Sequence, residues 1–201
     1  NAVIAAADRV GAWILADEVY RGAEREQTHE TYSFFGRYEK VIAIGSMSKA
    51  YGLPGLRVGW IVGPPDMVED LWRRHEYSTI TATMLSNHLA AHALSAQVRP
   101  RLIERARKYI RGGYPVLQQW MDSQSGLFSY TPPQASAVTF IRYNLDINST
   151  DLMHKLIEET GVFVAAGDSF GMDKHLRIAF GQDKAVLEDA FSRIEGVLTK
   201  L

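Results

Sequence analysis

The chain has 201 residues, of which 46% are hydrophobic and 22% are charged, a composition that can bury one large core or two small ones. Its formal net charge of -1 excludes bulk electrostatic attraction to nucleic acid or to an anionic membrane. No cysteine is present, which excludes disulfides and thiolate metal sites, and no apolar run approaches the roughly 20 residues of a membrane helix. We therefore expect a globular, cytoplasmic protein.

The N-terminal part of the chain predicts a mixed α/β sheet. Apolar residues at helical spacing predict a helix over 2–10. Short apolar runs then predict strands over 13–16, 41–44 and 57–62. The strand over 57–62 follows Lys49 after too few residues for a parallel crossover, which needs about a dozen or more. We expect the strand over 57–62 to be antiparallel.

Polar side chains follow two of these strands at the point where each strand ends. Asp17 follows the strand over 13–16, and Ser46, Ser48 and Lys49 follow the next strand. In open α/β sheets ligands bind beyond the carboxyl ends of the strands. The two strand exits therefore predict a binding site.

The remainder of the chain predicts a second, smaller domain. A loop is expected over 126–133, and we place the domain boundary between residues 105 and 106, giving domains 1–105 and 106–201. The elements expected after the first sheet are helices over 64–72 and 83–95, a helix after Pro100, a strand over 138–143, a helix over 151–160, strands over 162–165 and 176–180, and a helix over 184–198. The second domain is thus expected to be α+β.

Two motifs for a serine nucleophile are present without their usual context. Residues 46–49 match S-x-x-K, but the glycines and proline that follow oppose the helix that this motif needs. Residues 167–171 match G-x-S-x-G, but a strand rather than a helix is expected after them. We interpret both as coincidental matches.

Two other groups of residues have structural interpretations. His88 and His92 share a helix face, yet no third metal ligand accompanies them. The basic run over 99–111 is interpreted as a solvated helix face, because the chain as a whole is nearly neutral. Neither group predicts a metal site or a nucleic-acid interface.

The residues around Lys49 indicate one cofactor. Two serine hydroxyls, free backbone N–H groups and the planar fork of Arg57 make a cradle suited to a phosphate dianion. A lysine beside such a cradle, with Asp17 at the neighbouring strand exit, indicates pyridoxal 5'-phosphate. The glycines at 52, 55 and 59 do not form a dinucleotide fingerprint, because a strand and not a helix follows them.

The sequence resembles the fold-type I pyridoxal-phosphate enzymes, most closely the class I/II aminotransferases. The segments that carry the resemblance are ADEVY at 16–20, SMSKAYGLPGLRVGW at 46–60 and LRIAFG at 176–181. The resemblance implies an α/β fold with part of the mixed, mostly parallel sheet of the large domain, followed by a small α+β domain. It implies that roughly half of the enzyme lies upstream of Asn1.

The resemblance also implies residue roles. Lys49 corresponds to the lysine that forms the Schiff base with the cofactor and moves the substrate proton. Asp17 corresponds to the partner of the pyridine nitrogen, and Tyr20 to the phenol that bonds the cofactor's O3′. The phosphate-binding and substrate-binding positions correspond to Ser46, Ser48, Arg57 and, for the substrate carboxylate, Arg177.

The activity implied is transfer of an amino group between an amino acid and a 2-oxo acid by a homodimer. The same residues serve other pyridoxal-phosphate reactions, including decarboxylation, elimination and cyclising synthesis. They also occur in transcription regulators that carry an aminotransferase-like sensor domain. The usual Pro-Gly of the small domain is Ala166-Gly167 here, which weakens any expectation about the rigidity of that loop.

Overall fold

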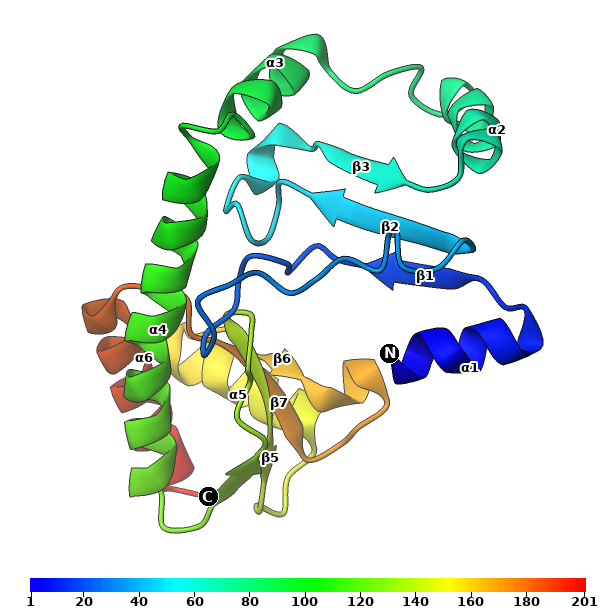
Figure 1. Cartoon of the computed structure of the whole chain (residues 1–201). Helices are drawn as coiled ribbons and strands as arrows, with labels where there is room; N and C mark the ends of the chain where they lie inside the picture. The colour runs from blue at the N-terminus through cyan, green and yellow to red at the C-terminus, as the bar shows by residue number, and fades with distance from the viewer. The chain divides into compact units, whose positions relative to one another are not determined.

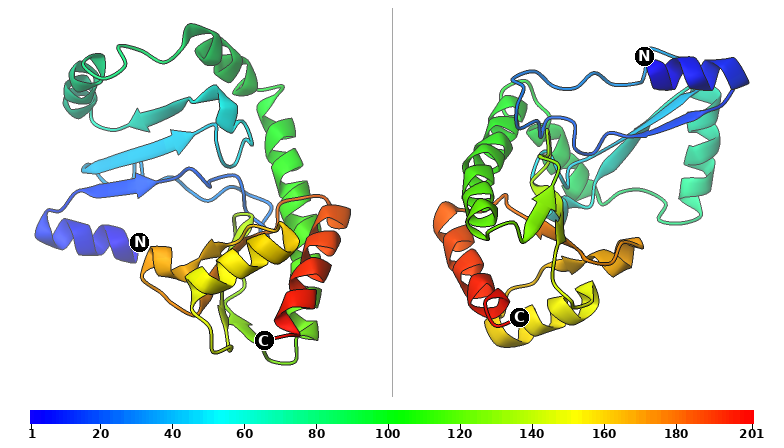
Figure 2. Two further views of the ribbon diagram at one scale, coloured as in Figure 1. Left: turned by 180° about the vertical axis from the view of Figure 1, so that it is seen from behind. Right: turned by 90° about the horizontal axis from the view of Figure 1, so that it is seen from below.

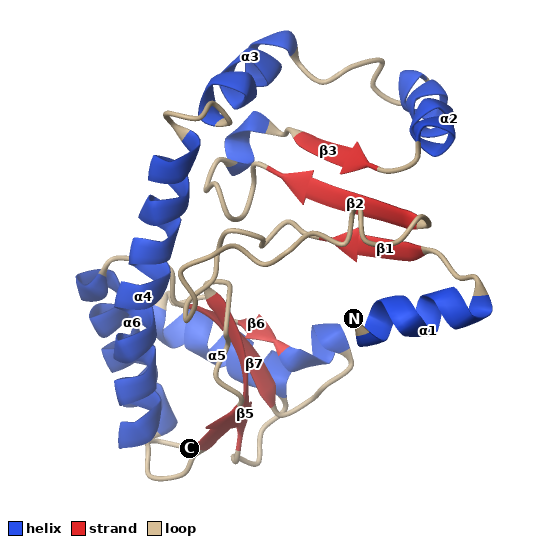
Figure 3. Cartoon of the chain, in the orientation of Figure 1, coloured by secondary structure: helices blue, strands red, loops and turns tan.

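A computed structural model describes all 201 residues, from Asn1 to Leu201. The chain divides into two compact units, Asn1–Ala106 and Arg107–Leu201, and Figure 3 shows that each combines helices with a sheet. The α/β class predicted from the sequence is therefore confirmed. None of the helices combines the length and the apolar character needed to cross a bilayer.

The first unit is built on a three-stranded sheet with helices before and after it. Its elements are α1 (Ala2–Val10), β1 (Ile14–Asp17), β2 (Val41–Ser46), a 3-10 turn (Pro54–Leu56), β3 (Gly59–Val62), α2 (Pro65–Glu76), α3 (Met84–Ala93) and the first two turns of α4 (Arg99–Ser123). The strand order is β1-β2-β3 (Figure 1). β1 and β2 are parallel and β3 is antiparallel to β2. The prediction of a mixed sheet is confirmed; its mostly parallel character stays a prediction.

One face of this sheet forms a small apolar core. Ile14 and Ala16 of β1 and Val41 of β2 are buried in one cluster with Ala7 of α1. Successive side chains of a strand point to opposite faces, so Leu15 points away from this cluster and is 67% exposed. The core therefore fixes which strand residues are buried and leaves the strand ends free to carry polar side chains.

The second unit places helices on an antiparallel sheet. Its elements are the rest of α4, β4 (Phe128–Tyr130), β5 (Val138–Tyr143), α5 (Ser149–Thr160), β6 (Ala165–Ala166), a 3-10 turn (Gly167–Phe170), β7 (His175–Ala179) and α6 (Lys184–Leu198). The strand order is β4-β5-β7-β6, with every pair antiparallel. Figure 2 shows α5 and α6 beside this sheet. Trp120 of α4 stacks on Phe191 of α6 with ring centroids 4.6 Å apart, which closes the core.

Two predictions in the second unit are wrong. The stretch 126–133, predicted as a loop, contains β4, because Phe128 and Tyr130 pair with β5. This pairing depends on a distant strand and leaves no local pattern. The strand predicted over 162–165 is reduced to the short β6, and Phe163 is 71% exposed outside it.

Candidate active site

The carboxyl ends of β1 and β2 lie at the same edge of the sheet because the two strands are parallel. Asp17 is the last residue of β1, and Ser46 is the last residue of β2. The Asp17 carboxylate is exposed and its Oδ1 accepts a hydrogen bond from the Val19 N–H at 3.2 Å. This edge therefore presents an open carboxylate one strand away from a serine hydroxyl.

The turn after β2 separates inward from outward side chains. Met47 and Ala50 are fully buried, and the Met47 N–H donates to the carbonyl oxygen of Val58 at 3.0 Å. The hydroxyl oxygen of Ser46 accepts a hydrogen bond from the N–H of Ser48 at 2.9 Å. Because the alternate residues are anchored in this way, the side chain of Lys49 is exposed.

The amine of Lys49 has no hydrogen-bond or ion-pair partner. Its nearest recorded neighbour is the ring of Tyr20, whose centroid lies 6.0 Å from Nζ, at the outer limit of a cation–π interaction. The Ala50 N–H donates to the carbonyl oxygen of Val19 at 3.4 Å, which joins the two loops that carry Lys49 and Tyr20. The fold thus brings together two residues that are 29 positions apart in the sequence, and leaves the amine available.

A pocket of about 650 Å³ collects the three residues predicted to bind phosphate. Ser46, Ser48 and Arg57 all line it, together with apolar and aromatic side chains that include Trp60 and Trp72. The sequence positions of the three polar residues are separated by a turn, so only the fold makes them neighbours. The pocket offers two hydroxyls and a guanidinium to one ligand.

Arg57 has an unusual backbone conformation. Its φ of 53° and ψ of 36° are left-handed, and it ends the 3-10 turn Pro54–Leu56. The predicted strand over 57–62 therefore begins later, at Gly59. A left-handed conformation is uncommon for a residue other than glycine and costs roughly 1–3 kcal/mol. In this conformation Nη1 of Arg57 donates a hydrogen bond to the carbonyl oxygen of Pro54 at 3.1 Å, and the residue lines the pocket.

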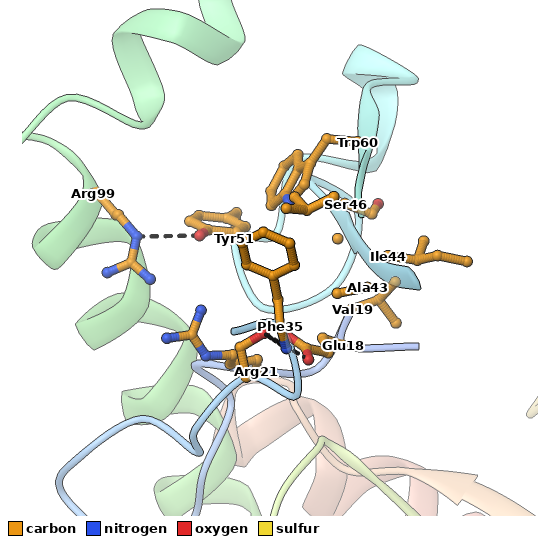
Figure 4. A pocket seen from close by; sticks show the side chains of 13 residues that line it. Glu18, Val19, Arg21, Phe35, Ala43, Ile44, Ser46, Tyr51, Trp60 and Arg99 are labelled. Atoms are coloured by element: carbon orange, nitrogen blue, oxygen red, sulfur yellow. Dashed lines mark hydrogen bonds between the residues drawn. The ribbon is translucent and has the colours of Figure 1, made fainter. Parts of the chain in front are cut away.

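A second pocket, of about 250 Å³, lies beside Ser46 and is shown in Figure 4. Its walls include Tyr51 and Trp60, whose rings meet edge to face with centroids 6.1 Å apart. Gly45 allows this arrangement, because a Cβ at that position would overlap the indole of Trp60. The wall of aromatic side chains thus depends on a glycine next to the carboxyl end of β2.

Comparison with known proteins decides the family. A family model described as "Aminotransferase class I and II" matches residues 1–194. The chain belongs to this family. Capreomycidine synthase of Streptomyces vinaceus is 34% identical over 78% of the chain and 40% of its own length. A probable aminotransferase of Arabidopsis thaliana, TAT2, is 25% identical over 94% of the chain and 49% of its own length.

A solved structure agrees with this assignment to the class I and II aminotransferases. The PLP-dependent aminotransferase from Streptococcus suis 89-1591 has a TM-score of 0.90 and 29% identity to the chain, over 98% of the chain and 51% of that protein. The chain therefore spans about half the length of the relatives it matches. The resemblance stated from the sequence is confirmed.

The family and this structure indicate pyridoxal phosphate as the cofactor, and the donor set described above fits it. The 650 Å³ pocket provides hydroxyls and a guanidinium for a dianion. The amine of Lys49 is unpaired and can react with an aldehyde once it is neutral. The open carboxylate of Asp17 can accept a hydrogen bond from a protonated ring nitrogen.

Arg177 lies in the second unit, in the middle of β7. Leu176 and Ile178 on either side are buried, whereas Arg177 is half-buried on the opposite face of the strand. Its register partners are Phe140 of β5 and Ala165 of β6. The guanidinium has no hydrogen-bond or ion-pair partner, so it is available to a ligand carboxylate.

The contacts of two arginines of α4, Arg99 and Arg107, are not evident from the sequence. Arg99 donates from Nη2 to Oε2 of Glu30 at 2.7 Å and from Nε to the hydroxyl of Tyr51 at 3.2 Å. Arg107, farther along the helix, is buried. The interpretation of 99–111 as a solvated face is therefore wrong for Arg99 and Arg107. The partners of Arg99 lie 48 and 69 positions away in the sequence. No local spacing signals these contacts.

The Arg99–Glu30 pair makes the stability of the fold depend on pH. The hydrogen bond from Arg99 lowers the pKa of Glu30 below its ordinary value of 4.5, and the charges of Arg99 and Arg21 act in the same direction. A carboxyl group whose folded pKa is lowered stabilises the fold fully above its unfolded pKa, and this contribution is lost as the pH falls through the folded value.

We predict that the difference in Tm between the wild type and Glu30→Gln is constant from about pH 8 to about pH 6 and shrinks below about pH 4.5. Calorimetry across this range measures it. Glu69→Gln is the control, because the pair of Glu69 with Arg73 is exposed and contributes little. A difference for Glu30→Gln that persists unchanged in acid would show that the pair does not contribute.

Proposed function

We propose that the protein containing this chain is an aminotransferase that moves an amino group between an amino acid and a 2-oxo acid, with pyridoxal phosphate attached to Lys49. The observation that carries the proposal is the unpartnered Lys49 amine beside Tyr20 at the edge of the sheet. Family membership supports it. Because the chain spans about half the length of its relatives, the proposal concerns the whole protein.

Three residues would act at the reacting end of the cofactor. Lys49 forms the covalent link and then moves the proton at the substrate Cα, which requires its amine to become neutral. Asp17 accepts a hydrogen bond from the ring nitrogen, and Tyr20 donates one to O3′. Bound pyridoxal phosphate supplies an electron sink for the substrate carbon.

Four residues would bind and orient. Ser46, Ser48 and Arg57 hold the phosphate through two hydroxyls and a guanidinium, as their shared pocket supports. Arg177 binds the substrate α-carboxylate through two parallel hydrogen bonds, a geometry that suits a guanidinium better than an ammonium. Its lack of a partner within the second unit supports this role.

The proposal extends to domains, assembly and location. Residues 1–105 belong to the large cofactor-binding domain with its mostly parallel sheet, and residues 106–201 form the small C-terminal domain. We propose a homodimer. Three exposed apolar side chains support it: Tyr77 directly after α2, Ile80 between the two helices, and Met84 at the start of α3. We also propose a cytoplasmic location, since a chain without cysteine needs no oxidising compartment.

A second candidate is another reaction at the same site, in which a product is cyclised or a group is eliminated. One observation favours it: the relative with 34% identity is named capreomycidine synthase and not aminotransferase. The residues at the site serve either reaction, because each begins with the same attachment to Lys49 and the same electron sink.

A single-turnover measurement separates the two candidates. The full-length protein loaded with pyridoxal phosphate is mixed with one amino acid at a time, without any 2-oxo acid. An aminotransferase releases about one equivalent of 2-oxo acid per site and then stops until an acceptor is added. Continuous product formation without an acceptor would favour the second candidate and contradict the first.

A further inference from the structure

The turn that carries Lys49 has two backbone hydrogen bonds between its own residues. Within it, the Gly52 N–H donates to the carbonyl oxygen of Lys49 at 3.0 Å, and the Leu53 N–H donates to that of Met47 at 2.9 Å. The link from Ala50 to the loop after β1 is long, at 3.4 Å. Met47, Ala50 and Tyr51 are buried against neighbouring segments, and the remaining backbone bonds of the turn go to those segments. A turn held mainly from outside opens more easily when its outside contacts are lost.

The first two turns of α4 supply part of this outside support. Arg105 donates from Nη2 to the carbonyl oxygen of Tyr51 at 3.0 Å and approaches that of Gly52 at 3.5 Å. Arg99 donates to the Tyr51 hydroxyl, and its guanidinium lies 5.7 Å from the centroid of the Tyr51 ring. All of these groups lie within the first unit.

The backbone around these contacts leaves little free space. Gly52 has a φ of 63°, and a Cβ there would lie 3.1 Å from Nη2 of Arg105. Two residues before Arg105, the buried Ile103 packs so closely on Gly22 that a Cβ on this glycine would come within 2.7 Å of it. α4 therefore packs closely against two loops of the candidate site, the loop that carries Tyr20 and the loop that carries Lys49.

We propose that Arg105 and Arg99 are positioning residues for Lys49. Arg105 holds the backbone at positions 51 and 52, two and three residues after Lys49, and Arg99 holds the side chain of Tyr51. The backbone at Lys49 therefore stays fixed while the amine moves. This inference rests on the proposed function for the role of the amine. Misplacing a reacting group by about 1 Å can slow a reaction about 10²-fold.

The first test needs no cofactor. Hydrogen–deuterium exchange is measured for the segment 47–53 in the full-length protein without pyridoxal phosphate. Arg105→Met keeps the length of the side chain and removes its donors, Arg105→Lys restores one donor, and Arg101→Met removes an exposed arginine of the same helix that has no side-chain partner. We expect exchange at least about fivefold faster in Arg105→Met, partly restored in Arg105→Lys and unchanged in Arg101→Met.

The second test follows attachment of the cofactor. Pyridoxal phosphate is added to each variant, borohydride stops the reaction at set times, and mass spectrometry quantifies the pyridoxyl adduct on Lys49. We expect attachment about tenfold slower in Arg105→Met, with recovery in Arg105→Lys. A loss of stability alone lowers the Tm without changing the attachment rate per folded molecule.

Each outcome decides the inference. Unchanged exchange in Arg105→Met means that the turn does not depend on Arg105. Faster exchange with an unchanged attachment rate means that Arg105 supports the turn without positioning Lys49. Either result overturns the proposal. Wild-type protein that forms no Lys49 adduct overturns the proposed function and, with it, the positioning of Lys49 for that reaction. In that case the exchange result shows separately whether the contacts of α4 hold the turn.

Discussion

Replacing Lys49 by alanine is expected to lower the rate of amino transfer by at least about 10³-fold, because one side chain supplies both the covalent attachment and the proton transfer. The folded structure should persist, since the Lys49 side chain is exposed and has no hydrogen-bond or ion-pair partner. Steady-state assays with the full-length protein and a calorimetric Tm test the two parts of this prediction.

Lys40→Ala is the matched control. Lys40 is half-buried and donates one hydrogen bond to the carbonyl oxygen of Gly11 at 3.1 Å, so its replacement should leave the rate within about twofold of the wild type. Equal rates for Lys49→Ala and the wild type would remove Lys49 from the reaction.

Gly113→Ala is expected to destabilise the second unit by roughly 1–3 kcal/mol or more, the range for forcing extra atoms into a packed core. A Cβ at this position of α4 would overlap the carbonyl oxygen of Phe180, and it would also crowd the side chain of Leu187. A backbone carbonyl cannot rotate away as a side chain can, so α4 would have to move. Chemical denaturation measures the loss.

The neighbouring glycine gives the opposite prediction. A Cβ at Gly112 meets nothing within 4 Å, and alanine is favoured over glycine within a helix by about 0.8–1.0 kcal/mol. Gly112→Ala should therefore stabilise the protein slightly. Equal effects of the two substitutions would contradict the packing of α4 described here.

The sequence predicted most accurately those elements whose ends are set by local chemistry. α1 ends at Gly11 and α5 ends at Gly161, and both glycines have the left-handed conformation that favours glycine after a helix. The stretch 167–171 leads into β7 and not into a helix, as predicted. In contrast, β4 depends on pairing with β5. It has only three residues, with glycine and prolines nearby, so the local sequence does not predict a strand there.

The same distinction applies to the site. Ser46, Ser48 and Lys49 could be predicted because they follow one strand closely, and the structure places the two serines in one pocket with Arg57. The contacts of Arg99 with Glu30 and of Arg105 with Tyr51 span 69 and 54 positions. Such contacts depend on where α4 lies, and the charge pattern of that helix indicated only solvent exposure.

The central claim is that Lys49 carries the cofactor. The most direct test is borohydride reduction of the full-length protein loaded with pyridoxal phosphate, followed by mass mapping of its peptides. We predict one pyridoxyl adduct, on Lys49, and none in Lys49→Ala. An adduct on another lysine only, or none in a protein shown to be folded, would contradict the account.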